Sequence, residues 1–317
     1  MKKLITVSLF ALMAGTAAQA EVTLRIGGAG SDTSPDTKAM EVFAEKLNER
    51  LGDGVAVELF PSSHLGTVDE MVEQVKGGVL ECMYESVGVL GSFHPAANIE
   101  GVAYVYHDVD HFFRIWRGPV GQEILDSIAD EAGFRVVGPA FHGFRQILTN
   151  VPIEKAEDLD GLKIRAPGIP AYIESIRAMG ANPATVAFEE VYAALQSHVV
   201  DGVEQPLTAI KDKRFHEVVK NLALTNHMAE TMGFMCNSDW YAGLDDATRN
   251  AIEASAVDSA DWYRTYTEES QAALLADLEA EGAIVTRPDI APFIARAATA
   301  QYDATLQPII EKVRAVE

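Results

Sequence analysis

VTLRIGGAG (residues 22–30) opens a stretch in which strand and helix patterns alternate as far as LECMY (residues 80–84). The run VTLRI alternates apolar and polar side chains, which is typical of a β-strand. Met40, Phe43 and Leu47 then recur at the spacing of one helical face. A second alternating run and a second helical pattern follow before LECMY. This order of elements predicts an α/β fold with a sheet rich in parallel strands.

The same rhythm continues toward the C-terminus. Further strands are expected at residues 134–141, 145–149 and 162–165, and further helices at residues 110–132, 188–199 and 288–316. From about residue 245 to 281 the chain has no proline and frequent alanine, which predicts one helix of about ten turns. A helix of that length exceeds the width of one small lobe, so we expect it to bridge two lobes that face each other across a ligand cleft. The predicted lobes are residues 21–142 plus about 231–270 (lobe I) and residues 143–230 plus about 271–317 (lobe II).

The N-terminus has the layout of a secretory signal peptide. Lys2 and Lys3 form a short basic region, residues 4–13 are almost entirely apolar, and AQA (residues 18–20) is a small-x-small cleavage site. The alternative is a buried N-terminal strand or helix. The apolar run is too short to span a membrane, so we predict a signal peptide at residues 1–20 and a mature protein exported to the periplasm.

The formal net charge of −22 narrows the set of partners. Such a surface repels nucleic acid and anionic lipid, so no nucleic-acid partner is expected. The protein can bind an anion only where a local cationic site outweighs the overall field. Arginines placed at a cleft therefore carry more information than usual.

The two cysteines, Cys82 and Cys236, each lie in an apolar run that is typical of a buried strand. An exported protein could join them in a disulfide. Buried free cysteine is also common, and we favour two free thiols. Their spacing does not fit a metal site.

The common enzyme motifs are missing: the sequence has no Gly-x-Ser-x-Gly elbow, no His-Glu-x-x-His and no phosphate-binding loop followed by Lys. GGAG (residues 27–30) lacks the spacing of a dinucleotide fingerprint and is interpreted as a turn. His107 and His111 could hold zinc on a helix, but Asp108 or Asp110 there fits a helix N-cap better. We therefore predict neither catalysis nor a metal or other cofactor.

Arginine provides the clearest candidate ligand contacts. Arg165 ends a short strand and is followed by a loop, where α/β proteins place their ligands. Arg145 begins another strand after a turn. A guanidinium offers a planar fork of donors that matches a carboxylate. The alternative is that each arginine pairs with a surface acid.

Glu204 and Gln205 lie in a segment that Gly202 and Pro206 mark as a turn. Glu204 could fix an arginine or accept hydrogen bonds from ligand hydroxyls, and Gln205 could donate to a carboxylate. The alternative is an ordinary polar loop.

Five motifs, in order and suitably spaced, resemble one family. They are FPSSHLG (residues 60–66), DGLKIRAPG (160–168), MGANP (179–183), FEEVYAALQ (188–196) and VDGVEQP (200–206). Together they are similar to the DctP-like solute-binding proteins of tripartite ATP-independent periplasmic (TRAP) transporters. The resemblance covers essentially the whole mature chain. It implies a two-lobed fold that closes over its ligand, and delivery of that ligand to a two-part membrane permease driven by a sodium gradient.

The resemblance also implies roles for single residues. Arg165 matches the family's main carboxylate-binding arginine, and Arg145 a second arginine that often assists it. Phe188 matches an aromatic that packs on the ligand, and Glu85 a position that often accepts ligand hydroxyls. Gln205 departs from the family, which usually has Asn there, and its longer side chain changes the shape of the pocket.

The predicted function is capture of a small organic acid. Arg165 would bind the carboxylate, helped by Arg145 and Gln205, while Glu85 and Ser86 hydrogen-bond the other end and the lobes close. A carboxylate at Glu85 would repel a second ligand carboxylate, which favours a hydroxylated monocarboxylate such as a sugar acid. The alternatives are a C4-dicarboxylate or another small carboxylate or sulfonate, a periplasmic ligand sensor, and an exported α/β hydrolase.

Overall fold

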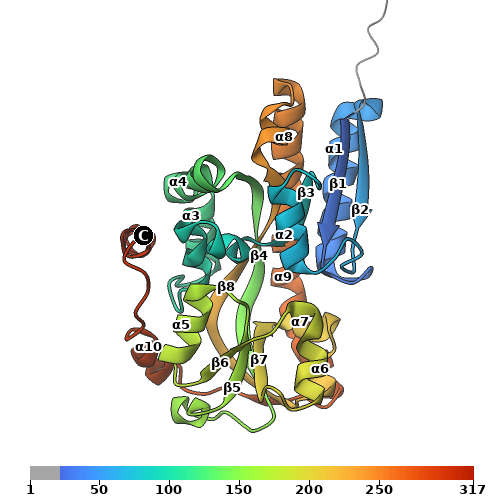
Figure 1. Cartoon of the computed structure of the whole chain (residues 1–317). Coiled ribbons are helices and arrows are strands. Elements are labelled where there is room, and N and C mark those ends of the chain that lie inside the picture. The colour runs from blue at the N-terminus through green and yellow to red at the C-terminus, as the bar shows by residue number, and fades with distance from the viewer. Residues whose placement is uncertain (1–21) are drawn as a thin grey trace, which may run out of the picture.

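The computed structural model describes residues 22–317, so the predicted signal peptide lies outside the described residues. Its strands form one mixed sheet in the order β2-β1-β3-β8-β4-β7-β5-β6, with β9 added beside β8 (Figure 1). The strands are β1 Val22–Gly28, β2 Val55–Phe60, β3 Cys82–Ser86, β4 Phe134–Thr149, β5 Lys163–Ala166, β6 Asn182–Thr185, β7 Gly202–Pro206, β8 Asn221–Asn237 and β9 Ile284–Thr286.

Helices flank this sheet in both halves of the molecule (Figure 1). They are α1 Pro35–Leu51, α2 Val68–Lys76, α3 Val109–Trp116, α4 Pro119–Ser127, α5 Pro170–Ala178, α6 Val191–Gln196, α7 Leu207–Asp212, α8 Ser238–Ala242, α9 Asp246–Ala280, α10 Ala291–Ala297 and α11 Gln307–Arg314. In the described part of the chain, no helix has the length and apolar character needed to cross a membrane.

Two long antiparallel strands, β4 and β8, connect the two halves of the sheet. At one end they adjoin the parallel group β1–β3, and at the other the parallel group β5–β7. The prediction of separate strands at residues 134–141 and 145–149 is wrong, because β4 continues through both. The pairing of β4 with β8 shifts register between Phe141 and Gly143, where Gly143 has a φ of 136° that few other residues tolerate. This shift lies at a predicted lobe boundary, and the boundaries themselves stay a prediction.

The long C-terminal helix is confirmed. Helix α9 begins after Asp245, whose side chain caps the backbone N–H of Thr248, and it runs for 35 residues. Its first half packs on α1, where Ser259 donates to the carbonyl of Ala39 at 2.7 Å. Just beyond its far end, Glu281 accepts from His216, 2.7 Å away in the opposite half of the molecule. Helix α9 therefore spans both lobes.

Three other sequence predictions are wrong in detail. Residues 110–132 do not form one helix, because Gly118 and Pro119 separate α3 from α4. Residues 288–316 hold two short helices, α10 and α11, with an irregular segment between them. Residues 202–206 form the buried strand β7 and not a turn. Pro206 does not mark a turn, because it is the last residue of this strand and the N-cap of α7.

The prediction of two free thiols is also wrong. Cys82 on β3 and Cys236 on β8 face each other directly across the antiparallel pair, with their Cα atoms 4.0 Å apart, and they form a disulfide. The two residues are 154 positions apart in the sequence. Only the pairing of β3 with β8 brings them together, and the local sequence carries no sign of that pairing.

Candidate ligand-binding site

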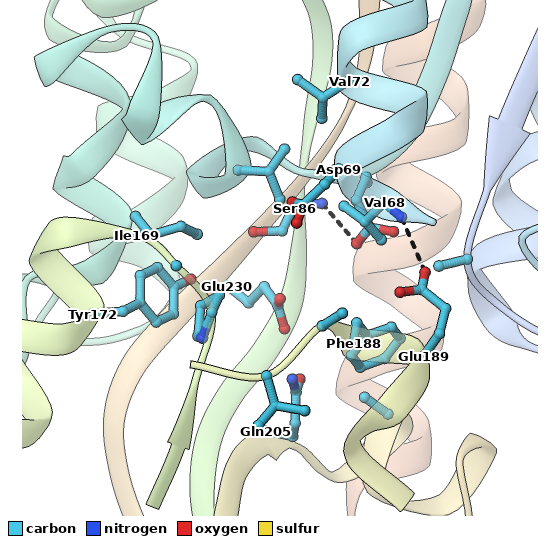
Figure 2. A pocket seen from close by; sticks show the side chains of 18 of the residues that line it. Val68, Asp69, Val72, Ser86, Ile169, Tyr172, Phe188, Glu189, Gln205 and Glu230 are labelled. Atoms are coloured by element: carbon cyan, nitrogen blue, oxygen red, sulfur yellow. Dashed lines mark hydrogen bonds between the residues drawn. The ribbon is translucent and has the colours of Figure 1, made fainter. Parts of the chain in front are cut away.

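A cavity of about 350 Å³ lies between the two halves of the molecule. Such a volume is at the small end of the range of about 300–1,000 Å³ for small-molecule sites. Figure 2 shows Ser86 and Val68 on one side of it and Gln205 and Phe188 on the other. Six of the seven predicted site residues line the cavity: Arg165, Arg145, Gln205, Glu85, Ser86 and Phe188.

Arg165 is a buried cation without a carboxylate partner. It lies on β5, and only 4% of its surface is exposed. Its Nε donates to the carbonyl of Val186 at 2.9 Å, and its guanidinium lies 5.9 Å from the centre of the Phe188 ring. Within residues 22–317, no Asp or Glu oxygen comes within 4.0 Å of it, and burial lowers its pKa to about 10. At neutral pH Arg165 thus remains charged, with its Nη groups free to bind an anion.

Arg145 is buried too, but its donors are occupied. Its Nη2 donates to Glu204 Oε1 and to the Glu204 carbonyl, both at 2.8 Å, and its Nε donates to Glu204 Oε2. Its Nη1 lies 2.7 Å from Glu230 Oε1. This leaves at most one N–H for a ligand, so Arg145 can donate one hydrogen bond to a carboxylate but cannot bind it in a bidentate way.

Glu204 does not line the cavity. It is fully buried behind Arg145, and its Oε2 lies 3.4 Å from His227 Nε2. Burial alone would raise the pKa of Glu204, but Arg145 and His227 lower it below its ordinary value. Of the two roles considered for Glu204, the geometry matches the fixing of an arginine.

Gln205 and Ser86 present polar groups to the cavity. The Gln205 side chain is 4% exposed and makes no hydrogen bond to a residue of the described chain, so its amide is available. The Ser86 hydroxyl donates to Glu100, so it can only accept from a ligand. Both side chains end in neutral groups, which suit ligand oxygens.

One wall of the cavity, formed by α1, β3, β4 and β8, carries a cluster of acidic and basic side chains that the sequence analysis missed. Asp36, His142 and Glu230 line the cavity next to Glu85. His142 Nδ1 lies 3.1 Å from Glu230 Oε2, and His142 Nε2 lies 3.6 Å from Asp36 Oδ1. These residues come from three elements distant in sequence, and no motif marks them.

This environment shifts three pKa values strongly. Burial raises the pKa of Glu85 to about 8, and the charge of Asp36 adds to the effect. Burial alone would lower the pKa of His142, but Asp36 and Glu230 raise it to about 9. Burial alone would raise the pKa of Glu230, but Arg145 and His142 hold it at about 2. At neutral pH, Glu85 is mostly neutral, His142 is charged and Glu230 is charged.

His107 and His111 contact each other at the start of α3. His111 is buried, and its Nδ1 accepts from the backbone N–H of His107, while Asp108 caps α3 as expected. No group of three potential metal ligands occurs among residues 22–317.

The comparisons with known proteins agree with this geometry. A family model described as bacterial extracellular solute-binding protein, family 7 (DctP), matches residues 26–306. The chain belongs to this family. Among the relatives of this solute-binding protein, the sialic acid-binding periplasmic protein SiaP of Vibrio cholerae is 30% identical over 315 residues, which cover 98% of each chain.

Two solved structures of TRAP periplasmic solute binding proteins from Roseobacter denitrificans share the fold of this solute-binding protein. One, with bound L-galactonate, is 28% identical with a TM-score of 0.87, and the match covers 92% of this chain and 98% of that one. The other, with bound β-D-glucuronate, is 30% identical with a TM-score of 0.88, and the match covers 93% of this chain and 100% of that one. The protein is thus a periplasmic solute-binding protein of the TRAP type with the predicted two-lobed α/β fold, and its relatives are solute-binding proteins and not enzymes.

Hydrogen bonds across the mouth of the cavity hold its two sides together. Glu189 Oε1 accepts from the backbone N–H of Val68 at 3.0 Å (Figure 2). The same oxygen accepts from the Ser63 hydroxyl at 3.1 Å. Lys213 Nζ donates to the carbonyl of Ala29 at 2.6 Å. These bonds form only when the two sides approach, so they favour the closed cavity.

Removing the Glu189 carboxylate should therefore speed ligand release. For Glu189→Ala we expect about fivefold faster dissociation, or about 1 kcal/mol, because two hydrogen bonds to a partly solvated carboxylate are lost. Stopped-flow fluorescence would measure the rate. The matched control is Glu190→Ala, which removes the next carboxylate, an exposed one with no hydrogen-bond partner in the described chain. Equal dissociation rates for the two variants would contradict this role.

Proposed function

We propose that this protein captures a hydroxylated monocarboxylate, such as a sugar acid, and delivers it to a TRAP membrane permease without chemical conversion. The single observation that carries the proposal is Arg165. A buried guanidinium without a carboxylate partner is costly, and a ligand carboxylate provides the missing charge-assisted bonds. Gln205 and Arg145 add donors to the same carboxylate, Phe188 packs on the ligand, and Glu85 and Ser86 bind its other end.

The ligands of the similar proteins support this chemical class. L-galactonate, β-D-glucuronate and sialic acid each carry one carboxylate and several hydroxyls. The cavity of about 350 Å³ suits a molecule of six or so carbons better than an extended one. Among the described residues that line the cavity, Arg145 pairs with Glu230 and Lys213 with Asp212, which leaves Arg165 for the ligand carboxylate. Several neutral or acidic groups remain for hydroxyls.

Thermal unfolding with a panel of acids tests the function. The panel contains hexonates, hexuronates, sialate, C4-dicarboxylates, keto acids and sulfonates. A ligand that binds only the folded protein adds about 2.7 kcal/mol of stability at a hundredfold excess over its Kd. For a chain of this size that corresponds to a rise of several degrees in Tm. We expect the largest rise with a hydroxylated monocarboxylate, and a response to dicarboxylates alone would refute the proposed class.

A hydrolase or isomerase should turn its ligand over. Incubation of the protein with the acid that gives the largest shift, followed by mass spectrometry, separates binding from catalysis. We expect the acid to be recovered unchanged.

A further inference from the structure

The cavity has a second polar region on the side away from Arg165, which we call the distal wall. It consists of Asp36 from the first turn of α1, Glu85 from β3, His142 from β4 and Glu230 from β8. These side chains do not touch Arg165, whose partner is the ligand carboxylate in the proposed function. The distal wall therefore faces whatever the other end of the ligand carries.

The distal wall has unused hydrogen-bonding capacity. His142 is 4% exposed and Glu230 is 6% exposed. Both ring nitrogens of His142 and the Oε2 atom of Glu230 lack an aligned hydrogen-bond partner in the described chain, although His142 lies between two carboxylates. Within the described residues, the Glu85 side chain accepts only from the backbone N–H of Ser86, at 3.1 Å. Buried polar groups usually find partners, and ligand hydroxyls, which both donate and accept, fit this mixture.

The charges of the distal wall oppose a second ligand carboxylate, but not through the residue that the sequence suggested. Glu85 is largely protonated at neutral pH, because its pKa is about 8. Glu230 carries a persistent negative charge, because Arg145 and His142 hold its pKa at about 2. Burial raises the pKa of its neighbour Asp36, and the charge of His142 opposes this rise. Within residues 22–317, His142 is the only cation between the two carboxyl groups, and both share it. Arg145, beside this wall, is held by Glu204 and Glu230. Within residues 22–317, no free cation of the distal wall therefore remains for a second carboxylate.

We propose that Asp36 and His142, together with Glu230, form a distal subsite that binds the neutral hydroxylated end of the ligand and rejects a second carboxylate. The proposal rests on the proposed function, in which Arg165 takes the first carboxylate. It makes Asp36 and His142 determinants of specificity. A sugar acid with a terminal hydroxymethyl group fits, and the corresponding diacid does not.

Two matched pairs of acids test the subsite. D-galactonate and D-galactarate share six carbons and the configuration of four hydroxyls, and they differ only in a terminal hydroxymethyl group against a carboxylate. D-gluconate and D-glucarate form the second pair. By calorimetry at pH 7, the wild-type protein is expected to prefer the monoacid of at least one pair by about a hundredfold or more, because unpaired like charges inside a closed site are strongly unfavourable. Equal or tighter binding of the diacids would overturn the subsite and leave the Arg165 anchor standing. Binding of no hydroxylated monocarboxylate, neither of these two pairs nor of the thermal-unfolding panel, would overturn the proposed function, and the subsite with it.

Asp36→Asn tests the residue assignment. The amide keeps an oxygen that can accept from the Tyr263 hydroxyl, which lies 2.7 Å from Asp36 Oδ1, but it cannot carry the negative charge of a carboxylate. The preference for the monoacid should fall by about tenfold or more. Because the readout is a ratio of two affinities in one protein, a general loss of binding cancels. The control Asp32→Asn removes an exposed carboxylate four residues away and should keep the wild-type ratio. An unchanged ratio in Asp36→Asn would overturn the assignment, and the wild-type comparison remains decisive if that variant does not fold.

Discussion

Replacing Arg165 with alanine is expected to weaken ligand binding by about 2–5 kcal/mol, roughly 30-fold to several thousandfold, without destabilising the ligand-free protein. The bound carboxylate would lose the one arginine or lysine that, among the described residues lining the cavity, has no carboxylate partner. The ligand-free protein would lose a desolvated charge that has no carboxylate within 4.0 Å in the described chain. Calorimetry gives the affinity, and thermal unfolding of the ligand-free variant gives the stability. An affinity within tenfold of the wild type would show that Arg165 is not the anchor.

Two further variants test whether the charge of Arg165 is enough without its planar geometry, and whether Arg145 acts in binding or in stability. Arg165→Lys keeps the charge but not the planar fork, so it should recover only part of the affinity. Arg145→Ala should instead lower stability by about 3–5 kcal/mol, because it leaves Glu204 and Glu230 buried without their partner. The contrast matters because the two arginines look alike in the sequence and differ only in whether the fold already supplies their carboxylates.

The sequence predicted that Arg165 lies at the ligand cleft, and the structure places it in the lining of the cavity. Arg165 is the penultimate residue of β5, just before a Pro-Gly loop, and the carboxyl ends of strands in an α/β sheet are where ligands bind. Asp36, His142 and Glu230 could not be predicted in this way. They come from the start of α1 and the middle of β4 and β8, and only the antiparallel pairing of the long strands places them together.

In the fold, too, features set by local sequence were predicted and features set by long-range pairing were not. Local periodicity predicted the alternation of the first three strands with α1 and α2, and the absence of proline predicted α9. The continuity of β4 across both lobes escaped prediction because a register shift at Gly143 interrupts the local alternation. Long-range antiparallel pairing is likewise invisible in local patterns, and the disulfide depends on that pairing.

Removing the disulfide with the double substitution Cys82→Ser, Cys236→Ser is expected to lower the free energy of unfolding by about 2–5 kcal/mol. The bond closes a loop whose ends are 154 residues apart, so its loss greatly enlarges the unfolded ensemble. Urea unfolding of the oxidised wild type, the reduced wild type and the double variant measures the change. Reductant should shift the unfolding midpoint of the wild type and leave that of the variant unchanged.

Ligand affinity should respond much less than stability to this change. The disulfide links β3 to β8 at Cys82. Glu85 and Ser86, which line the cavity, lie at the other end of β3 and are still held by the pairing with Gly233 and Met232. A pairing that persists without the covalent bond keeps the cavity intact while the unfolded state gains freedom. If the double variant lost affinity in proportion to its stability, the disulfide would instead be shaping the cavity, and the β3–β8 pairing alone would not be enough to position Glu85.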